Sequence, residues 1–397
     1  MQEKQQKIEW LWICLLSVII GGIVGVVDTF FGRVLLFLTD FRQAHFLLLI
    51  PFLAPVGMLF TYFYLKYGKN SSQGMNLIFD VGQREQEQVP KRLTPFIIIG
   101  TWLTHLFGGS AGREGVAVQI GAAIAHQTAR IFKSLEASQF IVIGMAAGFG
   151  GLFGTPLAAT FFAIEVMVVG RLRYDVFLPS LLGAFVASFV SSHLGLEKFE
   201  VALQMPVEMS VGLFWKLLVL GVLFGLVGLL FSFGMKQAKA FFANWLTNPI
   251  VRIGVVGVAL SLIFFLLGQG RYSGLGMNLI TDSFQGGTIH SYDWLLKLVL
   301  TILTVSVGFQ GGEVTPLFAI GATLGVLVAP FLGLPVLLVA ALGYASVFGS
   351  ATNTLLAPIF IGGEVFGFEY LPCFVIVCGL AFLCNGNVSI YGKQQKG

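Results

Sequence analysis

Charged residues are scarce in this sequence. Of its 397 residues only 11% are Asp, Glu, Lys or Arg, whereas a soluble globular domain usually carries about 25%. The net charge is only +4, and the sequence contains no long basic run, which argues against a nucleic-acid partner. These deficits argue against both a soluble enzyme and a nucleic-acid-binding protein.

Cysteine is also rare, and its placement indicates no metal site. The four cysteines are Cys14, Cys373, Cys378 and Cys384. All four lie in apolar segments and lack the spacing of metal ligands. We therefore expect buried free thiols, no metal ion and no cofactor.

What the sequence has in abundance is apolar residues and glycine. Hydrophobic residues make up 56% of the chain, the mean hydropathy is +0.88, and there are 50 glycines. Small residues let helices pack closely in lipid. The composition predicts an all-α polytopic membrane protein. Residues 1–9 are short and polar and are followed by an apolar run to about Leu38, which is too long for a cleaved signal peptide.

One stretch places charge inside this apolar chain. Gly108-Gly-Ser-Ala-Gly-Arg-Glu-Gly115 sets Arg113 and Glu114 beside a glycine run. A charged side chain in the middle of a membrane helix costs ~2.5–3.5 kcal/mol, so such residues are usually functional. The free N–H groups of a helix N-terminus attract anions. We therefore predict that Glu114 controls an anion site; the alternative is a buried salt bridge with Arg113.

The apolar segments predict the helices of the first half of the chain. They cover residues 10–38 (interrupted by Asp28), 46–66, 93–107, 114–130, 137–147, 153–169 and 174–193. The segment 74–79 lies between two basic clusters and has only about eight apolar residues, whereas a spanning helix needs ~20. We expect it to enter the membrane and return to the cytoplasmic side, where basic residues concentrate. Residues 194–210 are expected to form an external loop.

The second half repeats the first. Helices are expected at 211–234 and 252–268, with Lys236, Lys239 and Arg252 marking a cytoplasmic connection between them. Then Gly276-Met-Asn-Leu-Ile280 repeats Gly74-Met-Asn-Leu-Ile78. The distance from Gly144 to Glu165 and from Gly343 to Glu364 is 21 positions in both halves.

An internal duplication with broken helices is typical of secondary transporters. The first half has seven predicted crossings and one re-entrant piece. Because seven is an odd number, the second copy begins on the opposite side of the membrane and is inverted. We expect a cytoplasmic segment at 1–9, a first membrane repeat at 10–193, a linker at 194–210, a second repeat at 211–391 and a cytoplasmic tail at 392–397. Tyr391, on a predicted short terminal helix, is a candidate anion donor; the alternative is an interfacial tyrosine.

These motifs carry a family resemblance from about residue 10 to residue 392. Gly112-Arg-Glu-Gly115 with Val118-Gln-Ile-Gly121 resembles the gating-glutamate motif of the CLC chloride channels and anion/proton antiporters. Gly308-Phe-Gln-Gly-Gly-Glu-Val-Thr-Pro316 resembles the family's third signature, and Tyr391 falls where the family places its anion-coordinating tyrosine. The resemblance implies the CLC-type fold of two inverted-topology repeats and a homodimer with one pore per subunit.

The departures from the family pattern resemble the CLC-F clade, the bacterial fluoride/proton antiporters. Met75-Asn76 stands where the chloride-coordinating serine is usual, Val116 replaces a proline, and Val166 replaces a second glutamate. Thr315, after Val314, stands in a later motif whose threonine is associated with fluoride handling in this clade. Fluoride demands strong donors, which Thr315, Tyr391 and the free N–H groups around Gly115 and Val116 could supply.

Further roles follow from the same resemblance. Glu114 is implied to alternate between an anion site and carrying a proton. Glu313, at the analogous place in the second copy, is either a relay for protons or fluoride or a helix cap. Phe79 either lines the path by its ring edge or packs. Glu165 and Glu364 match across the repeat, which suggests structural hydrogen bonding.

The resulting expectation is a transporter, not an enzyme. It would export fluoride from a bacterial cytoplasm in exchange for protons, as a multi-pass protein of the inner membrane whose partners are fluoride, protons, the bilayer and a second copy. A CLC-type chloride or nitrate antiporter and a passive anion channel remain alternatives. A remote alternative is an intramembrane serine hydrolase, because Gly108-Gly-Ser110-Ala-Gly112 matches the nucleophile-elbow pattern.

Overall fold

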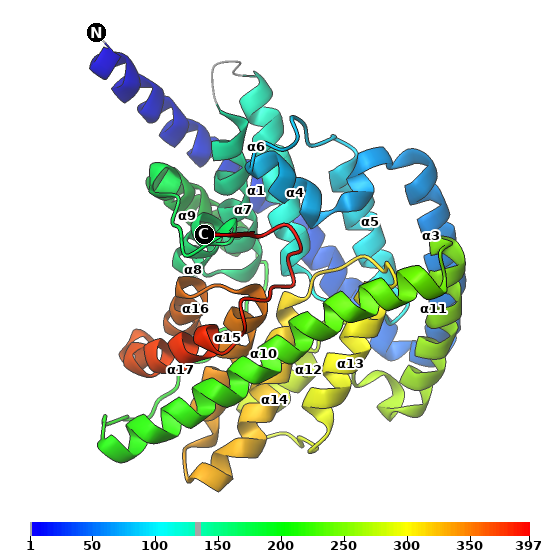
Figure 1. Ribbon diagram of the computed structural model, residues 1–397. Coiled ribbons are helices and arrows are strands. Elements are labelled where there is room, and N and C mark those ends of the chain that lie inside the picture. The colour runs from blue at the N-terminus through cyan, green and yellow to red at the C-terminus, as the bar shows by residue number, and fades with distance from the viewer. Residues whose placement is uncertain (1, 132–135) are drawn as a thin grey trace.

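The computed structural model describes residues 2–131 and 136–397 and is built almost wholly of helices. The first half contains α1 (Gln2–Ala44), α2 (Phe46–Leu49), α3 (Leu53–Tyr67), α4 (Met75–Gly82), α5 (Leu93–Leu106), α6 (Glu114–Ile131), α7 (Ala137–Phe153), α8 (Pro156–Glu165) and α9 (Phe177–His193). Short 3-10 turns cover Ile50–Phe52, Lys69–Gln73 and Tyr174–Val176. Figure 1 shows these helices in blue to green.

The second half follows a similar order of helices. It contains α10 (Val211–Trp245), α11 (Pro249–Leu266), α12 (Met277–Gln285), α13 (Asp293–Ser306), α14 (Val314–Leu332), α15 (Val336–Thr352), α16 (Leu356–Phe366) and α17 (Leu371–Leu383). Two further 3-10 turns cover Gly268–Gly270 and Phe368–Tyr370. The strands β1 (Val168–Val169) and β2 (Gln395–Lys396) pair in parallel, so the C-terminal tail returns to the first half. In Figure 1 the red tail runs across the centre of the molecule.

Helix ends follow local sequence. Ser210 accepts a hydrogen bond from Leu213 N at 3.1 Å and so caps α10, as expected for a serine N-cap. Asn248 caps α11, whose first residue is Pro249, the helical position that proline tolerates. At the end of α7, Gly154 has φ +85°, the left-handed conformation in which glycine terminates helices.

Several predicted boundaries were wrong. Asp28 does not interrupt α1, because its side chain is buried and the helix continues unbroken on both sides. The helix predicted at 137–147 runs to Phe153, because its glycines pack against neighbouring helices and only Gly154 leaves the helical conformation. The next helix therefore begins at Pro156 and ends at Glu165 instead of covering 153–169.

The predicted end of α10 was also wrong. The helix continues past the expected residue 234 to Trp245, so that Lys236 and Lys239 lie on the helix and not in a connection. Figure 1 shows this long green helix crossing the face of the second half. The tail differs as well, since Tyr391 lies in a non-helical segment and not on a short terminal helix.

The helices of the first half differ in length. Among the described residues of that half, three segments are long and apolar enough to span a membrane, at Ile8–Ala44, Phe46–Tyr67 and Tyr174–His193. α8 has ten residues, or about 15 Å at 1.5 Å per residue, roughly half of a ~30 Å hydrocarbon core. Short helices of this kind end inside the protein and can present their termini to a central site.

The two halves are related by reciprocal contacts, as inverted-topology repeats require. Glu165, at the end of α8, accepts hydrogen bonds from Leu356 N and Ala357 N at the start of α16. Glu364, near the end of α16, accepts from Leu157 N and Ala158 N at the start of α8. The predicted structural hydrogen bonding of these two glutamates is what the structure shows.

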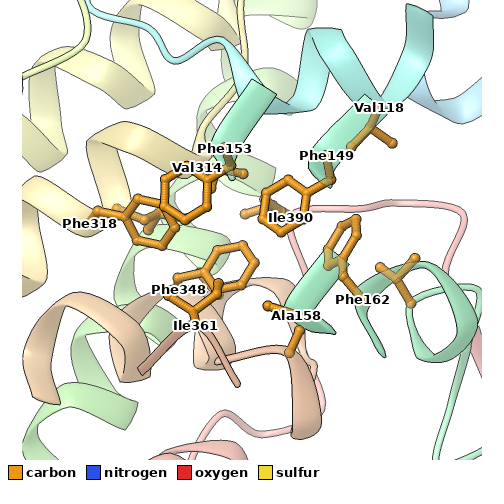
Figure 2. Packing of buried hydrophobic residues seen from close by; sticks show 14 of the residues in the cluster. Val118, Phe149, Phe153, Ala158, Phe162, Val314, Phe318, Phe348, Ile361 and Ile390 are labelled. Carbon is orange, nitrogen blue, oxygen red and sulfur yellow. The ribbon is translucent and has the colours of Figure 1, made fainter. Parts of the chain in front are cut away.

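Aromatic rings fill the contact between the repeats. Phe161 in α8 stacks on Phe360 in α16, with ring centroids 4.3 Å apart. Phe149 in α7 and Phe348 in α15 lie 6.4 Å from each other. Figure 2 shows Phe149, Phe348 and Phe318 in this central cluster. Buried aromatic contacts of this kind exclude water from the centre of the molecule.

Candidate functional site

Two glycine loops meet at the centre of the structure, just before α6 and α14. Gly112 N donates to Gly312 O at 2.5 Å and Gly312 N donates to Gly112 O at 2.8 Å. A Cβ atom on Gly112 would lie 3.0 Å from Gly312 O and 2.9 Å from the Pro316 ring. Glycine is needed here because only a missing side chain lets the two backbones pair. The pairing brings the N-termini of both helices together.

Glu114 is the first residue of α6, and its carboxylate lies at the N-terminus of α14. Its carboxylate is 1% exposed, and Oε2 accepts hydrogen bonds from Thr315 N at 3.2 Å and from the Thr315 hydroxyl. Hydrogen bonds to a carboxylate are stronger than neutral ones, and the partial positive charge of a helix N-terminus adds to them. The protein's own carboxylate therefore lies where a helix N-terminus would bind an anion.

Arg113 also contacts Glu114, but less closely. Its Nε lies 3.8 Å from Glu114 Oε1, and its backbone N donates to Oε2 at 3.2 Å. Nε and Nη1 of Arg113 are buried without a hydrogen-bond partner among the described residues. The predicted alternative, an Arg113–Glu114 ion pair, is therefore only a loose contact. The hydrogen bonds from Thr315 hold the carboxylate.

A cavity of about 170 Å³ lies beside Gly115, the residue after Glu114. Five residues singled out from the sequence line it, namely Met75, Asn76, Gly115, Glu313 and Tyr391. They come from α4, α6, the loop before α14 and the C-terminal tail. The other predicted residues, Phe79, Glu114, Val116, Val314 and Thr315, are buried and are not among the residues that line the cavity.

Tyr391 points a free hydroxyl into buried surroundings. The residue is 7% exposed, and its hydroxyl has no hydrogen-bond partner among the described residues. The preceding backbone is fixed by the bond from Ile390 N to Ala351 O at 2.9 Å and by the Ser389 hydroxyl on Thr352 O. A phenol held in this way is a donor available to an anion.

Phe79 supports this tyrosine from behind. It is fully buried, and its ring stacks on Tyr391 with centroids 5.4 Å apart and planes 30° apart. Of its two predicted roles, this contact fits packing, because a stacked ring presents its face and not its edge to the tyrosine.

Val116, predicted to offer a free N–H, and Glu313, considered as a helix cap, have environments that differ from those expected. The N–H of Val116 is not free, because it donates to Arg113 O at 3.1 Å within the first turn leading into α6. Glu313 stands at the N-cap position of α14, but its side chain makes no capping hydrogen bond. Instead it lines the cavity together with Lys239, which favours the relay interpretation over the capping one.

Sequence reasoning missed several residues of this cavity, among them the polar residues Gln119 and Lys239. Gln119 lines it one turn after Gly115; its Nε2 donates to Gly115 O, and its buried Oε1 has no partner among the described residues. Its position inside a quoted motif, as a polar residue on an apolar helix, was the available signal. Lys239 comes from α10, more than a hundred residues away in sequence, and no local pattern could have placed it there.

Ser110, the serine of the nucleophile-elbow match, lies in a buried hydrogen-bond network. Ser110 is fully buried, with Oγ 2.8 Å from Thr301 Oγ1 and 2.9 Å from Lys297 Nζ. Lys297 also donates to the backbone carbonyls of Tyr272 and Gly274. The ring of His105 faces the carbonyls of Thr101 and Ala111, away from the serine hydroxyl.

Comparison with known proteins gives the family. The sequence profile described as voltage gated chloride channel matches residues 52–386. The chain belongs to the voltage-gated chloride channel (CLC) family. A "Chloride/fluoride channel protein" of Pseudomonas syringae pv. tomato is 36% identical over 395 residues, covering 97% of this chain and 86% of the relative.

Solved CLC structures confirm the fold. The crystal structure of a CLC-type fluoride/proton antiporter is 59% identical to this chain, with a TM-score of 0.97, and covers 98% of this chain and 99% of the other. A slow cyanobacterial Cl⁻/H⁺ antiporter gives a TM-score of 0.81 at 19% identity, covering 96% of both chains. The predicted CLC-type fold of inverted repeats is confirmed, and the multi-pass membrane character of the chain follows from it.

Proposed function

We propose that this protein is a fluoride/proton antiporter of the CLC family that exports fluoride. The observation that carries the proposal is the Glu114 carboxylate bound to both the N–H and the hydroxyl of Thr315 at the start of α14. A group that can be charged or neutral occupies a site built for an anion. The similarity to a fluoride/proton antiporter at 59% identity supports the same function.

The geometry suggests how proton and anion exchange. While Glu114 is ionised, its carboxylate holds the donors of Thr315 and closes the site. Protonation removes the negative charge that those donors and the helix N-terminus stabilise, so the side chain gives way to an incoming anion. Anion and proton then exclude or replace each other at one place, which couples their movement in opposite directions.

The donors around the cavity favour a small, strongly hydrated anion. Met75 offers a thioether, a weak acceptor, in place of a hydroxyl donor. The Thr315 hydroxyl is bound to Glu114, and the Tyr391 hydroxyl has no partner among the described residues. Fluoride forms short, strong hydrogen bonds and would use these two donors more effectively than chloride would.

Glu313 is the proposed second carboxylate of the path. It lines the same cavity as Gly115, the residue after Glu114. We assign it a relay role for protons or fluoride between the cavity and Glu114. Gly115 and Val314 contribute backbone at the two helix starts.

The setting of the protein is also a proposal. The basic clusters predict that the 1–9 segment and the 392–397 tail face the cytoplasm and that the 194–210 linker is external. We propose a homodimer in the bacterial inner membrane. Two chains of 42.9 kDa should sediment together in detergent, and a monomer mass would contradict the dimer.

The decisive experiment measures anion and proton fluxes from liposomes that contain the purified protein. Fluoride and chloride electrodes record efflux, and a pH electrode records proton uptake. We expect fluoride efflux far above chloride efflux, accompanied by proton entry. Comparable chloride flux would make the protein a general CLC chloride or nitrate carrier, and fluoride flux without proton movement would make it a passive channel.

Glu114→Gln tests the coupling residue. The amide cannot be deprotonated, so proton uptake coupled to fluoride should disappear. The control is Glu369→Gln, which removes an exposed carboxylate outside the cavity and should leave both fluxes unchanged. A Glu114→Gln variant that still moves protons in a fixed ratio to fluoride would show that another group carries the proton.

A further inference from the structure

A second, larger hollow opens onto the site cavity. Its volume is about 380 Å³, and it shares Asn76, Lys239, Ile390 and Tyr391 with the smaller cavity. Its remaining walls come from the C-terminal tail, α10 and the end of α15. An ion that reaches the free Tyr391 hydroxyl from this side passes through this hollow, which we call the vestibule.

The charge that lines the vestibule has one sign. Lys236, Lys239 and Lys396 line it, and none of its lining residues is Asp or Glu. Lys236 and Lys239 are three positions apart on α10 and therefore lie on one face of that helix. None of the ion pairs found among the described residues involves these three lysines.

The wall of the vestibule is held in shape by side-chain amides. Asn353 Nδ2 donates to Asn387 Oδ1 at 2.8 Å, and Asn385 Nδ2 donates to Asn353 Oδ1 at 2.7 Å. Asn353 and Asn387 both adopt positive φ values, +55° and +56°, a conformation that asparagine accepts more readily than most residues. The chain of amides fixes the tail against α15 and so keeps Tyr391 and the lysines on one hollow.

Like charges on the wall of a concave surface raise the local concentration of ions of opposite sign. Field lines are focused by the surrounding low-dielectric protein, and on-rates of charged ligands can rise ~10- to 1,000-fold at low ionic strength. Exposed lysines that served only solubility would be interspersed with acidic residues. Here they converge on the entrance to a buried hydroxyl that has no other described partner.

We propose that this vestibule is the anion-capture site of the transporter: Lys236, Lys239 and Lys396 draw small anions from the cytoplasm and deliver them to Tyr391. The inference rests on the proposed function, because it assigns the captured ion as fluoride. The lysines set how efficiently dilute anion is used. They take no part in proton coupling, which belongs to Glu114.

The test compares Lys236→Gln/Lys396→Gln, which removes two vestibule lysines that do not line the site cavity, with Lys216→Gln. Lys216 lies on the same helix α10 but lines a different hollow, beside Glu208, so it controls for the loss of a lysine from this helix. Initial fluoride efflux is measured against fluoride concentration at low ionic strength and again with added potassium gluconate. The double arginine variant, Lys236→Arg/Lys396→Arg, controls for the charge itself.

For the glutamine double variant we expect the apparent KM for fluoride to rise roughly 10-fold at low ionic strength, the low end of electrostatic steering. The maximal rate and the proton-to-fluoride ratio should not change, and the difference from wild type should shrink in gluconate. The arginine variant should match wild type. An unchanged KM, or an equal effect of Lys216→Gln, would overturn the proposal.

Failure of the proposed function gives a separate result. If the wild-type protein moves chloride and not fluoride, the fluoride assignment falls, and the same comparison made with chloride still decides whether the vestibule captures anions. If fluoride is transported and the lysine variants behave as wild type, the vestibule proposal falls and the antiporter proposal stands.

Discussion

At the scale of single residues, the central feature is competition for the donors of Thr315. The threonine supplies a backbone N–H and a hydroxyl to one carboxylate oxygen of Glu114. The hydroxyl is the part that a substitution can remove without disturbing the helix start. It therefore offers a direct test of whether these donors form the anion site.

Thr315→Val should lower fluoride efflux by about tenfold or more. Valine keeps the shape of threonine but loses the hydroxyl, and a hydrogen bond to a charged group is worth ~1.5–3 kcal/mol, where about 1.4 kcal/mol is a factor of ten. Thr315→Ser keeps the hydroxyl and should retain most activity. Initial rates from liposomes measure both, and equal rates for the two variants would show that the hydroxyl is not a ligand.

At the scale of elements, short helices exchange their ends across the molecule. α8 and α16 each begin against a carboxylate from the other. Two buried backbone N–H groups per helix are satisfied in this way, groups that no intrahelical carbonyl can accept from. Because both bonds of each pair run between the repeats, these caps fasten the halves to each other.

Glu165→Ala should destabilise the protein by about 1–3 kcal/mol, the cost of leaving buried donors unpaired. Thermal unfolding in detergent, followed by circular dichroism, measures the change. Glu364→Ala should behave alike, since it removes the matching cap. The ratio of protons to fluoride in the folded fraction should not change, and an altered ratio would mean that Glu165 carries protons and is more than a cap.

Helix contacts within each repeat depend on glycine. A Cβ atom on Gly121 would lie 2.1 Å from Gly144 O, and one on Gly321 would lie 2.0 Å from Gly343 O. The same close approach of backbones occurs in both halves, between α6 and α7 and between α14 and α15. Closely packed helices of this kind are typical of membrane proteins.

Gly121→Ala should therefore cost about 3 kcal/mol or more, the upper end of overpacking, and reduce the yield of folded protein. The matched control is Gly379→Ala in α17, where an added Cβ meets nothing within 4 Å. Size-exclusion profiles in detergent compare the two. Equal yields of monodisperse protein would show that α6 and α7 can separate without loss.

At the scale of the whole molecule, the C-terminal tail joins the two repeats over the site. It pairs β2 with β1 in the first half, and Lys393 Nζ contacts Asp80 at 3.0 Å and Glu85 at 3.4 Å. The hydrogen bond to Asp80 and the nearby negative charges raise the pKa of Lys393 above its usual 10.5. Its contribution is therefore fully present below pH ~10.5 and is lost only as the pH rises through the higher folded value.

Deletion of residues 393–397 should lower fluoride efflux several-fold, although Tyr391 remains. The segment that holds the tyrosine would lose its strand pairing and its ion pairs, and a loosely placed donor binds an anion less well. Circular dichroism should still report intact helices. Lys396→Gln, which keeps the tail, separates this effect from the loss of vestibule charge; a deletion as active as this variant would mean that the tail does not position Tyr391.

Much of the fold and of the site could be predicted from the sequence, because it depends on local patterns. Composition determined the membrane class, apolar periodicity located most helices, and the repeated pentapeptide with its matched glutamates revealed the duplication. The stretch around Glu114 marked the site, because a charged side chain is costly in an apolar membrane segment and is usually kept there for function. Thr315 and Tyr391 were expected at the site from family resemblance, and the structure brings each to it.

The tertiary structure decided what depends on residues about two hundred positions apart. Whether the Glu313 carboxylate caps its helix or lines a cavity beside Lys239 follows from neighbours that no local window contains. The lengths of α7 and α10 were likewise decided by packing, since burial stabilises helical residues that local signals would end. Lys239 and Gln119 joined the cavity only because the inverted repeats place α4, α6, α10 and the tail around one point.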